Sequence, residues 1–255
     1  GEGGTVTPGT GTFERGTDAS FFIRPSAGYR IASLIVDGQT VSPAARYTFR
    51  NLDADHTIEA VFAASTPVED IFTDIDSDTW CRDAAQFVYD SCIMNGRTDT
   101  LFAHGAPLNR GMFVTMLYRL EGSPAVTTTS RFSDVTEDTW CHDAVVWGAE
   151  SGVVSGYSDG TFRPTATVSR QQLVTFLWRY SKAIGLDVSV GESTNILSYE
   201  DAFDVSEYAV PAVQWACGEQ ILRGAGGRLY PHADTTRGHA AAFLARFMEL
   251  MAASM

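Results

Sequence analysis

Three arginines of this sequence each follow a good helix-capping residue, and arginines in such places could bind an anion. They are Arg110 after Asn109, Arg170 after Ser169 and Arg237 after Thr236. A cation at the start of a helix opposes the positive end of the helix dipole, so it does not help the helix to form. Its recurrence at three matched positions favours another use. A guanidinium beside the free N–H groups of a helix N-terminus is suited to a carboxylate.

Three further sets of residues recur with the arginines and complete the candidate site. They are the aspartates Asp74, Asp134 and Asp201, the aromatics Trp80, Trp140 and Tyr208, and the glycines Gly96, Gly156 and Gly224. The aspartates could hold the arginines in internal ion pairs, with or without a ligand. The aromatic rings could stack on a sugar face or pack beneath the helices, since large aromatics mostly contribute core area. The glycines are predicted to end helices with positive φ, and could also let a sugar approach the backbone.

No other group of residues indicates catalysis or a metal. Residues 156–160 match the G-x-S-x-G pattern, but that nucleophile elbow needs a strand before it and a helix after it. Residues 74–78 resemble a calcium loop, yet Thr79 stands in place of the glycine and Ala85 in place of the final glutamate. We therefore expect no enzyme activity, no cofactor and no metal ion.

Composition limits the partners of the chain. It has 255 residues and a formal net charge of −13, which argues against nucleic acid, whose binding depends on neutralising phosphates. No apolar run is long enough for a membrane span, so no membrane insertion is expected. The chain opens with Gly1-Glu2-Gly3-Gly4 and shows no signal peptide. We expect it to be an excised piece of a longer protein.

Residues 1–64 are predicted to form a small all-β domain. The expected strands are 17–24, 29–36, 47–49 and 57–62, and Asp37-Gly38 is a strong hairpin signal. Residues 63–67 are predicted to be a linker.

The rest of the chain consists of three copies of one unit, predicted at 68–124, 128–184 and 197–255. The offset between the first two copies is 60 residues, as between Asp74 and Asp134. The third copy is a weaker match, and its offset from the second is larger because the Gly/Ser-rich segment 185–197 is predicted to be an inserted linker. Recurring units of this size indicate a repeat architecture.

Each copy is predicted to be a helix, a loop and a second helix that starts at Asn109, Ser169 or Thr236. The second helices carry apolar residues at spacings of three, four and seven, which make one apolar stripe per helix. The stripes are Phe113, Met116, Leu117 and Leu120; Leu173, Phe176, Leu177 and Tyr180; and Ala240, Phe243, Leu244 and Phe247. One short helical hairpin cannot bury its own face, so we expect a pseudo-threefold assembly around a central helix bundle.

These residues resemble S-layer homology domains, and the second copy is nearest to the family pattern. Its matching residues are Phe132, Asp134, Val135, Trp140, Gly156, Tyr157, Asp159, Gly160, Phe162, Pro164, Ser169 and Arg170. The resemblance implies a three-pronged spindle that binds secondary cell-wall polysaccharide, often with pyruvylated sugars, in grooves between the prongs. It also assigns the arginine of the family's Thr-Arg-Ala-Glu motif to the ligand.

Each copy departs from that motif, because Gly111-Met112, Gln171-Gln172 and Gly238-His239 replace Ala-Glu. Without the glutamate, only Ser169 with Gln172 is expected to form a capping box. The first domain resembles the divergent repeats of bacterial surface proteins through Gly28-Tyr29, Val36-Asp37-Gly38, Tyr47-Thr48-Phe49 and residues 55–58. That family usually acts as a spacer.

The sequence thus predicts a non-catalytic module at the bacterial cell surface that anchors a protein to the cell wall by binding an anionic polysaccharide. The twelve residues of the arginine, aspartate, aromatic and glycine sets are its predicted contacts. The alternative is a structural or adhesive module that has lost glycan binding, as the missing glutamates indicate, and binds other surface proteins.

Overall fold

The computed structural model describes residues 3–254, which divide into two compact units. The first comprises residues 3–104 and 116–124, and the second comprises 105–115 and 125–254. Helix α3 (Arg110–Leu120) starts in the second unit and ends in the first. Among the described residues, none of the helices has the length and apolarity that crossing a membrane requires.

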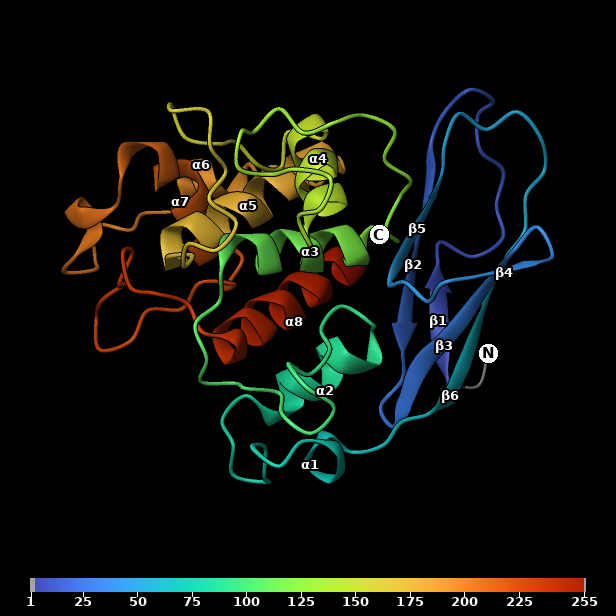
Figure 1. The fold of residues 1–255 in the computed structure, drawn as a ribbon, viewed down its shortest axis with the longest axis horizontal. Coiled ribbons are helices and arrows are strands. Elements are labelled where there is room, and N and C mark those ends of the chain that lie inside the picture. The colour runs from blue at the N-terminus through green and yellow to red at the C-terminus, as the bar shows by residue number, and fades with distance from the viewer. Residues whose placement is uncertain (1–2, 255) are drawn as a thin grey trace. The chain divides into compact units, whose positions relative to one another are not determined.

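The first unit begins with two antiparallel three-stranded sheets, drawn in blue to teal in Figure 1. One has the order β1-β2-β5 and the other β4-β3-β6. The strands are β1 (Gly4–Thr7), β2 (Ala19–Pro25), β3 (Tyr29–Val36), β4 (Gln39–Val41), β5 (Arg46–Phe49) and β6 (Ile58–Ala64). The four predicted strands are confirmed as β2, β3, β5 and β6, whereas the sequence patterns do not reveal β1 and β4. Asp37 and Gly38 both have positive φ and form the predicted hairpin between β3 and β4.

The sheets are fixed to the helices of the same unit, α1 (Val68–Ile71) and α2 (Arg82–Asp90), and to the end of α3. The side chains of Arg46 and Glu121 form a buried ion pair. The hydroxyl of Ser65 donates a hydrogen bond to the carboxylate of Asp90. The segment 63–67 is therefore not a free linker, because β6 continues to Ala64 and Ser65 is held against α2.

The second unit contains the remaining helices. They are α4 (His142–Glu150), α5 (Arg170–Ala183), α6 (Val190–Ser193), α7 (Val210–Gly218), α8 (Arg237–Ala253) and two 3₁₀ turns, Ala202–Asp204 and Glu207–Ala209. The predicted caps are confirmed, since Asn109, Ser169 and Thr236 each accept a hydrogen bond from the backbone three residues on. The expectation of a single capping box is wrong. His239 replaces the usual glutamate and forms a second box with Thr236, because an imidazole nitrogen can also accept a hydrogen bond.

The predicted apolar stripes are all buried. The rings of Phe113 and Phe176 stack with their centroids 6.2 Å apart, which joins the start of α3 to α5. Tyr180 of α5 meets Phe247 of α8 at 5.9 Å. These contacts explain why each stripe needs a neighbouring helix, since together they exclude water from all three.

The residues before the three second helices form a closed ring of backbone hydrogen bonds. The N–H of Leu108 donates to Thr235 at 2.8 Å, that of Thr235 donates to Val168 at 2.9 Å, and that of Val168 donates to Leu108 at 3.0 Å. A second set of bonds runs around the copies in the opposite direction, with the N–H groups of Arg110, Arg170 and Arg237 donating to Ala166, Ala233 and Ala106. Each copy therefore meets the next one in the same way at this point.

The inserted segment 185–197 is not only a linker. It includes the short helix α6, which lies against α7 (Figure 1). A Cβ atom on Gly191 would come within 3.0 Å of the backbone nitrogen of Trp215 in α7, so the close approach needs a glycine there. Packing against a buried tryptophan orders this Gly/Ser-rich sequence.

Candidate site between the repeats

Two of the three candidate arginines join one copy to the next. The Nε of Arg110 donates to the carbonyl oxygen of Phe162 at 2.9 Å, and its Nη2 donates to Ser155 at 3.3 Å. The Nε of Arg170 donates to Leu229 at 2.9 Å in the same way, and its Nη2 donates to the carbonyl of Arg223. Both side chains thus bind backbone carbonyls of the following copy, and neither forms the internal ion pair that the sequence left open.

Arg237 occupies the matching position at the start of α8 and is 6% exposed. Its backbone N–H donates to the carbonyl of Ala106 at 3.0 Å, as Arg110 and Arg170 do with their own partners. The structure therefore places all three arginines at equivalent helix starts.

The candidate aspartates hold the loops that the arginines contact. Asp134 accepts hydrogen bonds from the backbone N–H groups of Phe162 and Arg163, both at 2.7 Å. Asp201 accepts from Leu229 at 2.7 Å and from Tyr230 at 2.8 Å, and Asp74 accepts from Phe102 and His104. Burial acts to raise the pKa of Asp201, but these backbone hydrogen bonds together outweigh it and hold that pKa below its usual range. Asp134 and Asp201 thus hold in place the loops whose carbonyls accept hydrogen bonds from Arg110 and Arg170.

The prediction that Gly96, Gly156 and Gly224 end helices with positive φ is wrong. The first helices end earlier, and the positive-φ residues near their ends are Cys92, Gly152 and Gln220. These positions require glycine because an aromatic ring lies against each of them. A Cβ on Gly156 would lie 2.4 Å from the ring of Phe132, and one on Gly224 would lie 2.4 Å from that of Tyr199.

The candidate aromatics have large exposed fractions. Trp80 is 59% exposed, Trp140 is 58% and Tyr208 is 51%. Trp140 still contacts the start of α3, since a Cβ on Gly111 would meet its ring at 3.0 Å. These rings are accessible enough to stack on a sugar, and that role stays a prediction.

A second arginine follows each candidate arginine by nine residues, a signal that our sequence analysis missed. Arg179 of α5 donates from Nη1 to the hydroxyl of Ser155 at 2.9 Å, and Arg246 of α8 donates to the carbonyl of Ile221 at 2.9 Å. Burial lowers the pKa of both guanidinium groups. Since the carbonyl of Ser155 also accepts from Arg110, Arg110 of α3 and Arg179 of α5 reach the same residue. Arg170 and Arg246 likewise reach neighbouring carbonyls, those of Arg223 and Ile221.

The first of these arrangements, which we call the first cationic cluster, comprises Arg110, Arg179, Tyr157 and Tyr208. The guanidinium of Arg110 lies 4.9 Å from the ring centroid of Tyr157. Burial lowers the pKa of Arg110, and the neighbouring charge of Arg179 acts in the same direction. Burial also raises the pKa of Tyr208, whereas Arg110 and Arg179 oppose that rise. Two cations and two phenol rings therefore lie together in a chain of net negative charge. A third cation, Arg163, lies 4.1 Å from the ring centroid of Tyr157, but it is paired with Asp159.

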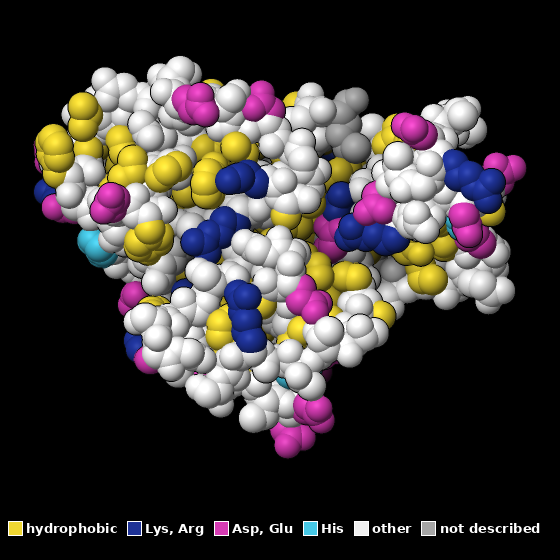
Figure 2. Space-filling model, turned by 90° about the horizontal axis from the view of Figure 1, so that it is seen from above, with side chains coloured by type: hydrophobic (Ala, Val, Ile, Leu, Met, Phe, Trp, Pro, Cys, Tyr) yellow, Lys and Arg dark blue, Asp and Glu magenta, His cyan; other side chains and the backbone are white. Residues whose placement is uncertain are grey.

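The second cationic cluster comprises Arg170, Arg223 and Arg246. Burial lowers the pKa of Arg170, with a further contribution from Arg246. Among the residues that the structure describes, no carboxylate forms an ion pair with Arg110, Arg179, Arg170 or Arg246. Figure 2 shows several dark-blue basic side chains set singly among hydrophobic and uncharged ones, and others beside magenta acidic side chains at the right of the view. Carbonyl and hydroxyl partners, rather than paired carboxylates, hold these guanidinium groups. In the second cluster the charges of Asp201 and Glu249 still favour the charged forms of Arg170 and Arg246.

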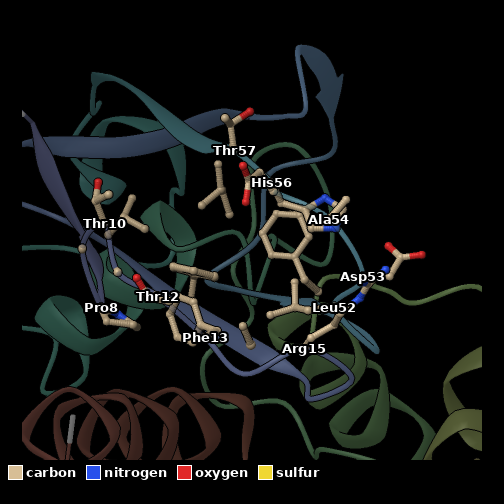
Figure 3. Close-up of a pocket in the computed structure, with 18 residues that line it drawn as sticks. Pro8, Thr10, Thr12, Phe13, Arg15, Leu52, Asp53, Ala54, His56 and Thr57 are labelled. Atoms are coloured by element: carbon tan, nitrogen blue, oxygen red, sulfur yellow. The ribbon is translucent and has the colours of Figure 1, made fainter.

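A separate cavity of about 690 Å³ lies in the β domain (Figure 3). Phe13, Leu52, His56 and Thr57 are among its lining residues. None of the twelve candidate residues lines it, so it is not the site that the repeats predict.

Comparison with known families identifies the repeats. Residues 131–174 and 198–241 match the S-layer homology domain. Two segments of this chain thus match S-layer homology repeats. Residues 1–66 match the divergent InlB B-repeat domain. Both matches confirm the resemblances noted from the sequence, for two of the three expected copies and for the β domain.

Curated relatives of the chain are much longer proteins. An endoglucanase of Bacillus sp. (strain KSM-635) is 25% identical over 171 residues, which is 67% of this chain and 18% of the relative. An amylopullulanase of Thermoanaerobacterium thermosulfurigenes is 26% identical over 180 residues, or 70% of this chain and 9% of the relative. A cellulosome-anchoring protein of Acetivibrio thermocellus is 26% identical over 144 residues, which is 53% of this chain and 32% of the relative. The chain thus spans about a third or less of these relatives.

The S-layer homology matches, together with relatives named as cell-surface and anchoring proteins, support a location at the bacterial cell surface. The matched enzymes share only a small part of their length with this chain.

Proposed function

We propose that this chain anchors a surface protein to the cell wall by non-covalent binding of an anionic polysaccharide between its repeats. The observation that carries the proposal is the uncompensated charge of the first cationic cluster. A guanidinium that is partly buried without a counter-ion gains strongly from a carboxylate, because the surrounding protein screens the attraction less than water does. Tyr208 and Tyr157 would cover the apolar face of the sugar ring that bears the carboxylate.

The arrangement of the site rests on three equivalent copies, of which residues 68–124 are the first. We infer a pseudo-threefold array with a central helix bundle, and the closed rings of backbone hydrogen bonds support it. In this array Arg110 and Arg170 hold the loops in place through Nε. The second arginines, Arg179 and Arg246, would bind the ligand carboxylate together with them. Asp134 and Asp201 would contribute indirectly, by holding the loops that the arginines contact. The candidate glycines would contribute indirectly too, by leaving room for the aromatic rings packed against them. Arg237 is proposed to contact the ligand from the start of α8, and Trp80 and Asp74 stay predicted contacts of the first copy.

Co-sedimentation with purified cell walls tests this function. The variant Arg179→Gln keeps the loop contacts of Arg110 and removes one cation, so we expect the fraction bound to fall about tenfold or more. Arg131→Gln is the matched control, because it makes the same change of net charge at an exposed arginine whose guanidinium lies over its own neighbour Phe132. Equal binding by both variants would contradict the proposal.

A further inference from the structure

The third copy carries an exposed apolar patch beside a hollow. Phe203 is 89% exposed and Leu197 is 64% exposed. Both line a hollow of about 490 Å³ together with Ile196, Ala202 and Val205, which are buried and form its floor. We call these five residues the third-copy patch. A phenylalanine so exposed beside a hollow with an apolar floor indicates a contact surface rather than a core position.

The patch is peculiar to the third copy. Phe203 stands two residues after Asp201, where the first copy has Asp76 and the second has Thr136. Those two polar residues close a turn with a threonine three residues on, through the hydrogen bonds of Asp76 to Thr79 and of Thr136 to Thr139. Leu197 lies at the end of the inserted segment 185–197. The repeat fold itself therefore does not require either apolar side chain.

The chain segment that carries the patch is acidic. Residues 183–222 contain seven Asp and Glu residues and no Lys, Arg or His. Outside it, Arg228 lies 3.7 Å from Glu200 and 3.8 Å from Asp201, and the ring of His232 donates to the backbone carbonyl of Asp204. Glu192 lines the hollow, and both it and Asp204 are exposed. A surface that combines apolar anchors with exposed carboxylates attracts a partner of positive charge and repels an acidic one.

We propose that the third-copy patch binds a protein segment in which an apolar side chain is flanked by lysines or arginines. The apolar side chain enters the hollow against Ile196 and Val205, while Phe203 covers it and the basic residues face Glu192 and Asp204. A second copy of this chain fits less well, because the same carboxylates would meet across the contact. This binding is separate from polysaccharide anchoring and does not depend on the cationic clusters.

The test uses a fluorescein-labelled peptide Lys-Lys-Leu-Phe-Lys-Lys and the intact chain, with fluorescence anisotropy as the readout. We expect saturable binding that weakens about tenfold in Phe203→Ser and in Leu197→Ser, since each removes an exposed apolar side chain that the bound peptide would cover. Leu101→Ser is the matched control, because Leu101 is an exposed leucine outside the patch. The double variant Glu192→Gln, Asp204→Asn should weaken binding and reduce its dependence on salt. Circular dichroism confirms that each variant is folded.

Several outcomes would overturn the proposal. One is the absence of binding, and another is equal binding of a peptide in which glutamates replace the lysines. A third is an affinity that Phe203→Ser and Leu101→Ser change equally. The last outcome comes from sedimentation equilibrium of the chain alone. A dimer that Phe203→Ser abolishes would show that the patch binds a second copy of this chain instead.

Discussion

Arg110 and Phe162 lie 52 residues apart in the sequence and are joined by a hydrogen bond of 2.9 Å from a guanidinium Nε to a carbonyl oxygen. Asp134 holds the N–H of the same Phe162. One loop residue is therefore fixed from both sides, by an acid of its own copy and by a base of the preceding copy. This relationship explains why a cation occupies a helix start where the dipole disfavours it.

Replacing Arg110 should lower stability as well as binding. Arg110→Ala removes two charge-assisted hydrogen bonds from a residue that is 4% exposed, so we expect a loss of about 2–3 kcal/mol in the free energy of unfolding. Urea titration followed by tryptophan fluorescence measures it. Arg131→Ala should change that free energy by less than about 0.5 kcal/mol, and a similar small change in Arg110→Ala would contradict the role of the loop contact.

Asp201 should make stability depend on pH at the acid end. Its pKa in the folded state is held below the usual range, so its contribution is complete above the unfolded value of about 3.9 and is lost as the pH falls through the folded value. We expect Asp201→Asn to be less stable than the parent by about 2 kcal/mol at pH 7. Unfolding curves from pH 7 to pH 2 should show this gap closing below about pH 4. A gap that is constant with pH would show that the carboxylate charge is not involved.

Gly156 should not tolerate a methyl group. A Cβ there would lie 2.4 Å from the ring of Phe132 and 2.6 Å from the carbonyl oxygen of Thr161. Gly156→Ala should therefore cost about 2 kcal/mol or more by overpacking, which a thermal melt would report as a lower Tm. Gly105→Ala is the control, since a Cβ on Gly105 meets nothing within 4 Å. Equal Tm values for the two variants would show that contact with the Phe132 ring is not the reason for a glycine at position 156.

The ion pair of Arg46 and Glu121 should stabilise the contact between the β domain and the end of α3. Both side chains are almost fully buried, so Glu121→Gln leaves an unpaired buried cation and should lower the free energy of unfolding by about 3 kcal/mol. Asp83→Asn, which breaks a pair whose carboxylate is 94% exposed, should have an effect of less than about 1 kcal/mol. A stable Glu121→Gln variant would contradict the buried ion pair.

Local signals in the sequence predicted much of the architecture. The helix starts at Asn109, Ser169 and Thr236 follow from capping chemistry, and the buried stripes follow from the helical period. The hairpin at Asp37-Gly38 follows from the conformational freedom of those two residues. In each case the physical cause lies within a few residues of its effect.

Other features could not be predicted because contacts distant in sequence determine them. Cys92 and Gln220 adopt positive φ without being glycine, since the fold imposes that conformation at the end of the first helix. The requirement for glycine at position 156 comes from the ring of Phe132, which lies in a different segment. Arg179 carried a usable signal, because an arginine recurs nine residues after each candidate arginine, and only the contact with Ser155 shows its importance.

Isothermal titration with a purified wall oligosaccharide tests the central claim most directly. The ligand is compared with the same oligosaccharide after chemical removal of its carboxylate groups. An uncompensated guanidinium pair predicts that the intact chain binds the native sugar at least tenfold more tightly than the stripped one, and that Arg179→Gln abolishes this preference. Equal affinity of the intact chain for both sugars would contradict the account, because Arg110 and Arg179 would then have no role in reading the charge of the polysaccharide.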